Sequence, residues 1–217
     1  GTACGTLKLS VIKQSDGDSI AAAPREVGMV SIDRDGASAP QLYHSYDPDD
    51  DDDGLDDTTL PLFETGDLGY LDDDGYLYLT GRSREGINRG GELIAPREIE
   101  DALSIHPDLP QGTELLVFAA PHDELGEVVG IAVPSDSSPS LHALRDWLAS
   151  SLPTTHLPLV MVRMAEPLPR TPGTLKLQRV GFASAVGLPM CTGSLPVTYE
   201  QQQQQQALVR ISDDEGG

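Results

Sequence analysis

Cysteine and aromatic side chains are scarce in this sequence of 217 residues. The two cysteines, Cys4 and Cys191, lie near opposite ends of the chain, and no Cys-x-x-Cys or Cys/His ligand spacing occurs. This pattern predicts reduced thiols in an intracellular protein and argues against a structural zinc site. The aromatic fraction of 5% and the hydrophobic fraction of 38% indicate an ordered core diluted by disordered segments.

Positive charge is also in short supply. Lys and Arg number 14 against 35 Asp and Glu, which gives a formal net charge of −21. Because such a surface repels phosphate backbones and anionic lipids, we expect no nucleic-acid partner and no general membrane role. No apolar run approaches the ~20 residues of a membrane span.

Targeting signals are missing as well. The chain begins with Gly1 instead of Met, which suggests a fragment, and its first residues lack the basic and apolar regions of a signal peptide. The sequence ends in Asp-Glu-Gly-Gly, without the Ser-Lys-Leu ending of peroxisomal proteins. We expect a cytoplasmic protein, with a peroxisomal location as the alternative.

The pattern of apolar residues predicts a two-part α/β (α+β) chain. Alternation predicts strands at residues 7–13 and 27–32, and an Asp-Gly turn predicts a hairpin at 71–79. From residue 76 to 183, strands alternate with helices, as in a compact α/β domain. The elements predicted there are a helix that begins at Pro96, strands at 114–119, 128–133 and 159–164, and a helix capped by Ser138-Pro139 that carries Leu141, Leu144 and Leu148.

Two segments are expected to be disordered. Residues 47–57 are mostly aspartates, which repel one another and stay solvated, and the spacing of a calcium-binding EF-hand is absent. Residues 184–217 lose hydrophobic periodicity and include the homopolymer from Gln201 to Gln206.

Three short segments carry polar groups suited to nucleotide chemistry. Residues 63–68 place an Asp in a glycine turn, where its carboxylate can accept hydrogen bonds from ribose hydroxyls or simply stabilise the turn. Residues 81–92 combine paired glycines with arginines, which suit sugar and phosphate oxygens but also describe a solvated basic loop. Residues 168–179 place one lysine in a Pro/Gly-rich loop before a predicted helix. That lysine can neutralise charge developing on an acyl phosphate, or it is an ordinary surface residue.

In their order along the chain, these segments resemble the adenylate-forming (AMP-binding) superfamily, which includes acyl-CoA synthetases, luciferases and peptide-synthetase adenylation domains. Residues 65–82 and 87–100 match the sequence motifs of this superfamily at almost every position. The resemblance covers residues 24–183, and within the family it is closest to ligases of the oxalate–CoA ligase type. It implies that residues 1–80 end a large AMP-binding domain in a small β-barrel-like subdomain. Residues 81–183 would then form the α/β C-terminal domain.

The resemblance also implies roles for individual residues. Asp67 would hold the ribose hydroxyls of the adenylate, and Arg82 would help to bind ribose or phosphate. Arg84 falls at the hinge about which the C-terminal domain rotates between half-reactions. Lys176 would be the catalytic lysine that contacts the carboxylate and the α-phosphate during adenylation. Leu175, directly before it, stands where the family usually has glycine.

A further set of implications concerns the reaction. A carboxylate and ATP would give an acyl-adenylate, which the thiol of CoA then captures, with Gly90 and Gly91 lining the thiol tunnel. Mg²⁺ is expected through an N-terminal domain that is missing from this sequence, and no metal ligands are assigned within it. Without that domain the fragment should catalyse little. The alternatives are a truncated, non-catalytic module of the same fold and an adenylation domain that loads a carrier protein.

Overall fold

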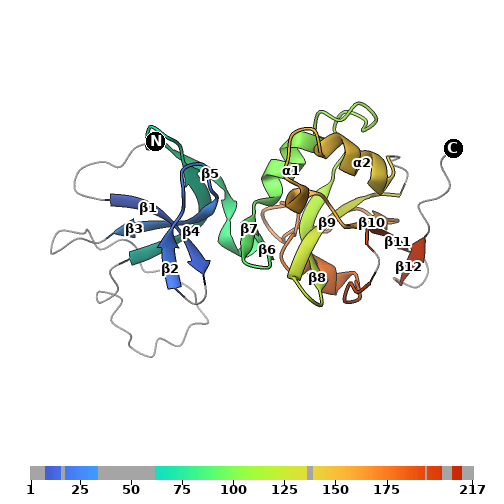
Figure 1. Cartoon of the computed structure of the whole chain (residues 1–217). Helices are drawn as coiled ribbons and strands as arrows, with labels where there is room; N and C mark the ends of the chain where they lie inside the picture. Colours follow the sequence, from blue (N-terminus) through green and yellow to red (C-terminus); the bar gives the residue numbers. More distant parts are fainter. Residues whose placement is uncertain are drawn as a thin grey trace. The chain divides into compact units, whose positions relative to one another are not determined.

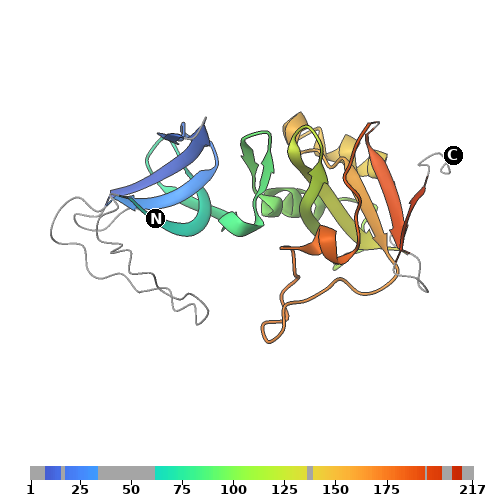
Figure 2. The same cartoon turned by 90° about the horizontal axis from the view of Figure 1, so that it is seen from below.

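The computed structural model describes residues 8–15, 18–33, 62–135, 139–193, 195–201 and 207–211. These residues form two compact units, one up to Leu79 and one from Thr80 onward, which Figure 1 and Figure 2 show from two sides. The acidic run at 47–57 and the glutamines from 202 to 206 lie outside the described residues.

The first unit is a five-stranded sheet with the order β2-β1-β3-β4-β5. Its strands are β1 (Lys8–Ser15), β2 (Asp18–Ala21), β3 (Gly28–Asp33), β4 (Leu62–Leu71) and β5 (Leu77–Arg82). β1 pairs antiparallel with β2 and β3, and β3 pairs antiparallel with β4. β1 and β3 confirm the strands predicted at 7–13 and 27–32. The strand order is linear, so the described strands form no closed barrel.

The hairpin between β4 and β5 is built around Asp72. Its carboxylate accepts hydrogen bonds from the backbone N–H groups of Tyr76 (2.8 Å) and Asp74 (3.1 Å). The first of these is the main reason why the pKa of Asp72 is lowered. Gly75 takes a φ of 80°, which glycine adopts without steric cost. The predicted Asp-Gly turn is therefore confirmed.

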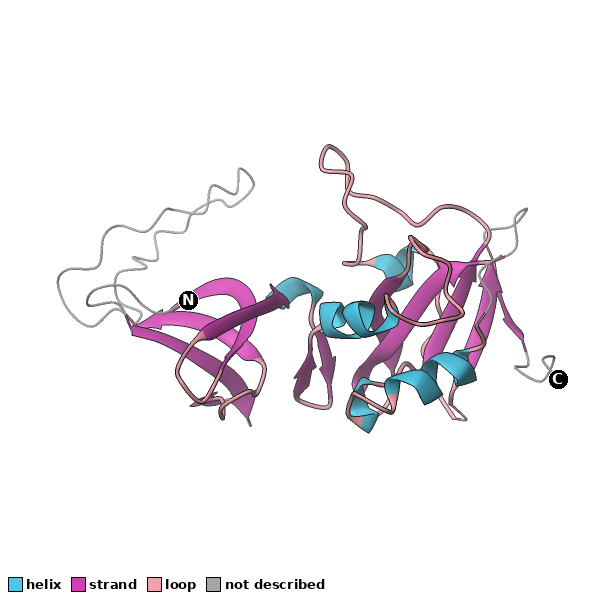
Figure 3. Ribbon diagram, turned by 90° about the horizontal axis from the view of Figure 1, so that it is seen from above, coloured by secondary structure: helices cyan, strands magenta, loops and turns pink. Residues whose placement is uncertain are grey.

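The second unit is a mixed seven-stranded sheet with helices on its faces (Figure 3). Six strands follow the order β12-β11-β10-β9-β6-β7, and β8 pairs with β9. β10 runs parallel to β9 and β11, and the other pairs are antiparallel. The strands are β6 (Ile87–Arg89), β7 (Glu92–Ile94), β8 (Leu116–His122), β9 (Gly126–Pro134), β10 (Val160–Met164), β11 (Val197–Gln201) and β12 (Leu208–Ile211).

In the described part of the second unit, three α-helices and two short 3₁₀ turns accompany the strands. They are α1 (Pro96–Leu103), α2 (Leu141–Leu148), α3 (Phe182–Ala185) and the 3₁₀ turns Ser83–Glu85 and Thr154–His156. The predicted α/β class of this part is confirmed, as are both predicted helices. Over the described part of the chain, no helix is long and apolar enough to cross a membrane.

Alternate residues of the central strands build two cores, one on each face of this sheet. In β8, Val117 belongs to the core that includes α1 and α2, whereas Leu116 and Phe118 belong to the core that includes α3. The two longer helices contribute to the first core through Ile99, Leu103, Leu141, Leu144 and Leu148. All five side chains are fully buried, and the face of α2 predicted from the sequence is the one that packs.

The start of α2 differs by two residues from the expected position. Ser140 caps the helix, because its Oγ accepts a hydrogen bond from the N–H of Ala143 (3.1 Å). The predicted cap, Ser138, lies outside the described residues. Farther along α2, Trp147 donates through Nε1 to the carbonyl oxygen of Ala102 (3.1 Å), which ties α2 to α1.

The expectation of a disordered tail at 184–217 does not hold for its described part. β11 and β12 lie in this segment and extend the sheet from β10. The physical reason is burial, since the second core gains four apolar side chains from the segment: Val186, Leu188, Cys191 and Val197. Burial, followed by the nearby charge of Asp123, raises the pKa of the Cys191 thiol. The buried residues of this segment follow no regular hydrophobic period, so no local pattern predicted that the segment is ordered.

Candidate active site

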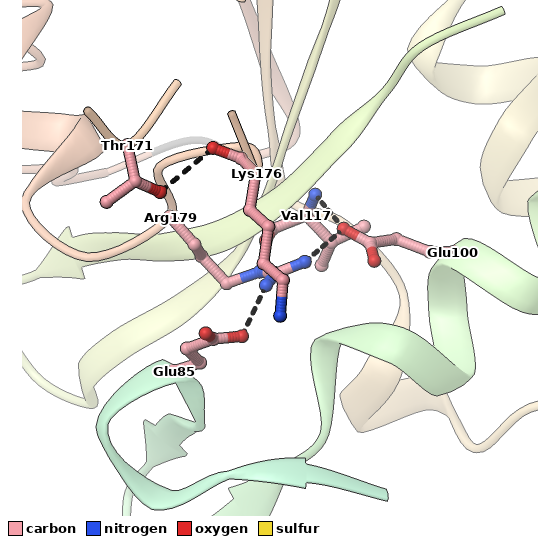
Figure 4. Close-up of polar contacts among 6 residues, drawn as sticks. All are labelled: Glu85, Glu100, Val117, Thr171, Lys176 and Arg179. Carbon is pink, nitrogen blue, oxygen red and sulfur yellow. Dashed lines mark hydrogen bonds and ion pairs between the residues drawn. The ribbon is translucent and has the colours of Figure 1, made fainter. Parts of the chain in front are cut away.

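The predicted catalytic lysine lies in a loop that hydrogen bonds close at its neck. Thr171 donates to the carbonyl oxygen of Lys176 from its N–H (2.7 Å) and from its hydroxyl (3.0 Å; Figure 4). The N–H of Gln178 donates to the carbonyl oxygen of Pro169 (2.8 Å). The Lys176 side chain is exposed, and no described carboxylate forms an ion pair with it. Its ammonium group is therefore open to a ligand while its backbone is held.

Leu175, which stands where the family resemblance leads us to expect glycine, has an unusual backbone conformation. Its φ is 56°, in the left-handed region, and its side chain is 68% exposed. Nη1 of Arg170 donates to its carbonyl oxygen (2.6 Å), and Arg170 also pairs with Glu114. Leucine pays a steric cost in this region that glycine avoids, so the local geometry explains why glycine suits the position.

Arg179 has no role predicted from the sequence, yet its guanidinium makes three hydrogen bonds beneath this loop (Figure 4). Nε donates to the carbonyl oxygen of Val117, Nη1 to Oε2 of Glu85, and Nη2 to Oε1 of Glu100, each at 2.6 Å. Oε1 of Glu100 also accepts from the N–H of Val117 (2.9 Å). The Arg179 side chain is only 13% exposed. It joins the segment after Lys176 to the first 3₁₀ turn, α1 and β8.

Gly90 and Gly91 form the two-residue turn between β6 and β7. Their φ angles are 58° and 94°. A type I′ hairpin turn needs positive φ at both central positions, so the glycines have a conformational reason to be there. The N–H of Gly90 donates to the carbonyl oxygen of Leu125 (2.9 Å), and that of Gly91 to Oδ1 of Asn88 (2.9 Å). An exposed stretch of backbone without side chains is thereby held next to the start of β9.

Asp67 lies in the first unit, at an irregularity of β4. The register between β3 and β4 shifts at this point, and Gly66 has a φ of 74°. Thr65 donates through Oγ1 to the carbonyl oxygen of Val30 (2.9 Å) and accepts from the N–H of Asp67 (3.1 Å). Bulges of this kind re-aim a side chain and are common beside functional sites. The Thr-Gly-Asp sequence therefore has a structural role in turning Asp67.

A pocket of about 310 Å³ lies in the second unit. Arg84, the predicted hinge residue, lines it together with Glu85, Glu127 and Arg179. The structure thus places Arg84 and Arg179 on the wall of one pocket, and the hinge role of Arg84 stays a prediction. Lys176 itself does not line this pocket. Arg82, at the end of β5, is exposed.

The described residues contain no cluster of side chains that could form a metal site. Among them, no group of three or more His, Cys, Asp or Glu side chains could hold a metal ion. The Mg²⁺ expected from the family resemblance therefore has no fitting cluster in this part of the protein, and no described residue is assigned to it.

Comparisons with known proteins give partial matches in sequence. No family model matches the chain. The oxalate–CoA ligase of Arabidopsis thaliana is 51% identical over 71 residues, which are 33% of this chain and 13% of that protein. The oxalate–CoA ligase of Saccharomyces cerevisiae is 38% identical over 119 residues, which are 54% of this chain and 21% of that protein. The chain therefore matches less than a quarter of the length of either relative.

A solved structure matches over more of the chain. The O-succinylbenzoate–CoA synthetase MenE of Bacillus subtilis, in complex with ATP and magnesium, has a TM-score of 0.57 and 26% sequence identity. The match covers 84% of this chain and 35% of the MenE chain. The two ligases and the synthetase are all named for joining an acid to CoA.

Proposed function

We propose that this chain, which is the C-terminal part of a member of the AMP-binding, adenylate-forming superfamily, belongs to an ATP-dependent acyl-CoA synthetase. The enzyme activates a carboxylate with ATP as an acyl-adenylate and releases pyrophosphate. It then transfers the acyl group to the thiol of CoA and releases AMP. The observation that carries the proposal is the exposed ammonium group of Lys176, which forms no ion pair with a described residue, on a backbone held by hydrogen bonds.

Lys176 serves the first half-reaction. As the carboxylate oxygen attacks the α-phosphorus and pyrophosphate leaves, negative charge gathers on the oxygens around the phosphorus. A compact ammonium on a long stem reaches that charge and stabilises it more in the transition state than in the ground state.

The remaining predicted residues bind the nucleotide and admit the thiol. Asp67 accepts hydrogen bonds from the ribose hydroxyls, and Arg82 contributes a contact to ribose or phosphate. Arg84 is the hinge at which the small domain turns between the half-reactions. Gly90 and Gly91 line the path of the thiol, because a backbone without side chains leaves room for the pantetheine arm.

The other participants are a carboxylic acid, ATP, CoA and Mg²⁺. Mg²⁺, which accompanies ATP in the MenE complex, neutralises phosphate charge when bound. We assign its ligands and the acid pocket to an N-terminal domain of the same enzyme. Because two relatives are oxalate–CoA ligases, oxalate is the first acid to test.

One observation favours a second candidate, a non-catalytic module of the same fold. Leu175 occupies a left-handed position directly before Lys176, where glycine would be unstrained. If the protein no longer catalyses a reaction, the loop around Lys176 need not keep its catalytic geometry, and leucine in place of glycine would be tolerated. The two candidates differ in whether acid-dependent pyrophosphate release occurs.

The test uses the full-length protein that carries this chain, together with its Lys176→Ala and Arg97→Ala variants. Arg97 is a matched control, because its side chain is 73% exposed and its one ion pair among the described residues is with Asp101, one helical turn away. Pyrophosphate release from ATP is measured with oxalate and a panel of small carboxylic acids, and the thioester product is identified by mass.

We expect acid-dependent release by the wild type and by Arg97→Ala. Lys176→Ala should lose about 100- to 1,000-fold in rate, the usual cost of removing one transition-state contact. Folded wild-type protein that binds AMP but releases no pyrophosphate with any acid would favour the non-catalytic module. Full activity of Lys176→Ala would contradict the role given to the lysine.

A further inference from the structure

The chain from residue 169 to 182, called the lysine segment below, is held in place both before and after Lys176. Before and around it, the backbone pairs of Thr171 with Lys176 and of Gln178 with Pro169 close the loop. After it, Arg179 is bound through its guanidinium, and Phe182 packs on Phe118 with a centroid distance of 4.7 Å. The side chain of Lys176 is therefore exposed, while the backbone that carries it has little freedom.

Arg179 is the polar anchor of that segment. Each of its three guanidinium nitrogens donates to one acceptor. The acceptors come from three separate elements, which are the 3₁₀ turn Ser83–Glu85, α1 and β8. A guanidinium presents these donors in a rigid planar fork, which the ammonium group of a lysine cannot reproduce. Removal of the fork would also leave the carboxylates of Glu85 and Glu100 without the cation that they share.

One of the acceptors lies beside the predicted hinge. Glu85 follows Arg84 directly, and both line the same pocket as Arg179. The ion pair at 2.6 Å therefore connects the lysine segment to the turn that begins the second unit. When the hinge turns, the lysine segment and this turn move together as long as the pair is intact.

We propose that Arg179 is a positioning residue for acyl-adenylate formation, which holds Lys176 in place by binding the segment after it to Glu85, Glu100 and β8. This inference rests on the proposed ligase function. Arg179 acts through Lys176 and touches no reacting atom, so its loss should affect the half-reaction that uses the lysine and spare the other.

A purely structural role makes different predictions. General destabilisation would slow both half-reactions and would add to the effect of removing Lys176. A positioning role slows adenylation alone, and it disappears once the lysine is gone, because residues that act as a unit are not additive.

The experiment compares Arg179→Ala, Arg179→Lys and Glu85→Gln in the full-length protein, with Arg97→Ala as the control. Adenylation is followed by acid-dependent ATP–pyrophosphate exchange, and the second step by thioester formation from a supplied synthetic acyl-adenylate. Amide hydrogen exchange is measured at Thr171, Leu175 and Gln178, whose N–H groups close the loop. This last readout does not depend on activity.

We expect Arg179→Ala to lower kcat for adenylation about 100-fold, as a displacement near 1 Å of a reacting group does. Thioester formation from the supplied adenylate should stay near the wild-type rate. Arg179→Lys and Glu85→Gln should fall in between. The double variant Lys176→Ala/Arg179→Ala should be no slower than Lys176→Ala alone, and the three amides should exchange faster in Arg179→Ala than in the wild type or in Arg97→Ala.

Three results would overturn the proposal. The first is an equal loss in both half-reactions, and the second is an additional loss in the double variant. The third is unchanged amide exchange in Arg179→Ala, which would show that the arginine does not hold the loop. A wild type without acid-dependent exchange would instead refute the ligase function. Amide exchange would then decide by itself whether Arg179 anchors the segment.

Discussion

The backbone of Leu175 stores strain that a single substitution should release. Its φ of 56° costs a leucine about 1 kcal/mol. Because the side chain is 68% exposed, Leu175→Gly gives up little packing. Glycine loses more entropy on folding, which offsets part of the gain. We expect a net stabilisation of about 0.5 kcal/mol, seen as a rise of about 1–2 °C in the thermal midpoint of the chain.

Thr174→Gly is the matched control for this substitution. Thr174 is an exposed neighbour in the same loop, and its φ is not in the left-handed region. Thr174→Gly relieves no strain and adds only the conformational entropy that glycine loses on folding. The thermal midpoint should therefore fall or stay unchanged. Equal gains at both positions would mean that loop flexibility, and not the conformation of Leu175, sets the stability of this region.

The residues of the site differ in how far the sequence could reveal them. Asp67 and Lys176 could be proposed because the chemistry follows from residue type and from the motif around each one. Arg179 could not, because its carboxylate partners Glu85 and Glu100 lie 94 and 79 positions away. No local pattern indicates which acidic residues will meet a given arginine in the folded chain.

At the scale of elements, the close packing of β8 on β9 depends on Gly130. A Cβ at this position would lie 2.6 Å from Cζ and 2.7 Å from Cε2 of Phe118, a fully buried ring. Gly130→Ala must therefore displace the ring and disturb its contact with Phe182. Overpacking of this kind costs about 1–3 kcal/mol, which equilibrium unfolding in urea would measure.

A control and a rescue test this explanation. Gly81→Ala adds the same methyl group where nothing lies within 4 Å, so its free energy of unfolding should not fall by a comparable amount. Combining Gly130→Ala with Phe118→Leu should cost less than the sum of the two single changes, because the smaller side chain gives the new methyl room. Strict additivity would argue against a clash between these two residues.

Elements with a clear hydrophobic period were predictable, and those without one were not. β8, β9 and β10 appear close to their expected positions because alternate residues face two cores. β11 was missed because it pairs with β10, which lies more than thirty residues earlier in the chain, and β12 was missed with it because β12 pairs with β11. Short strands that complete a sheet from a distance leave little trace in local sequence.

At the scale of the whole molecule, the chain divides between Leu79 and Thr80 into two compact units. Every buried residue in the two hydrophobic cores of the second unit lies between Ile87 and Val197. We therefore expect residues 80–217, expressed alone, to unfold cooperatively at the midpoint that this unit shows within the whole chain. Scanning calorimetry of both proteins makes the comparison.

The shorter chain also separates folding from function. Phe118→Ala within residues 80–217 removes a buried ring shared by β8 and α3 and should cost about 3–5 kcal/mol, which lowers the same transition. If residues 80–217 prove unfolded while the whole chain is folded, then residues before Thr80 must contribute to this core. If they fold, the Arg179 network is intact, since all four of its residues lie beyond Thr80. Amide exchange at Thr171, Leu175 and Gln178 can then be measured without any catalysis, so that the anchoring of the lysine segment is tested apart from the chemistry it serves.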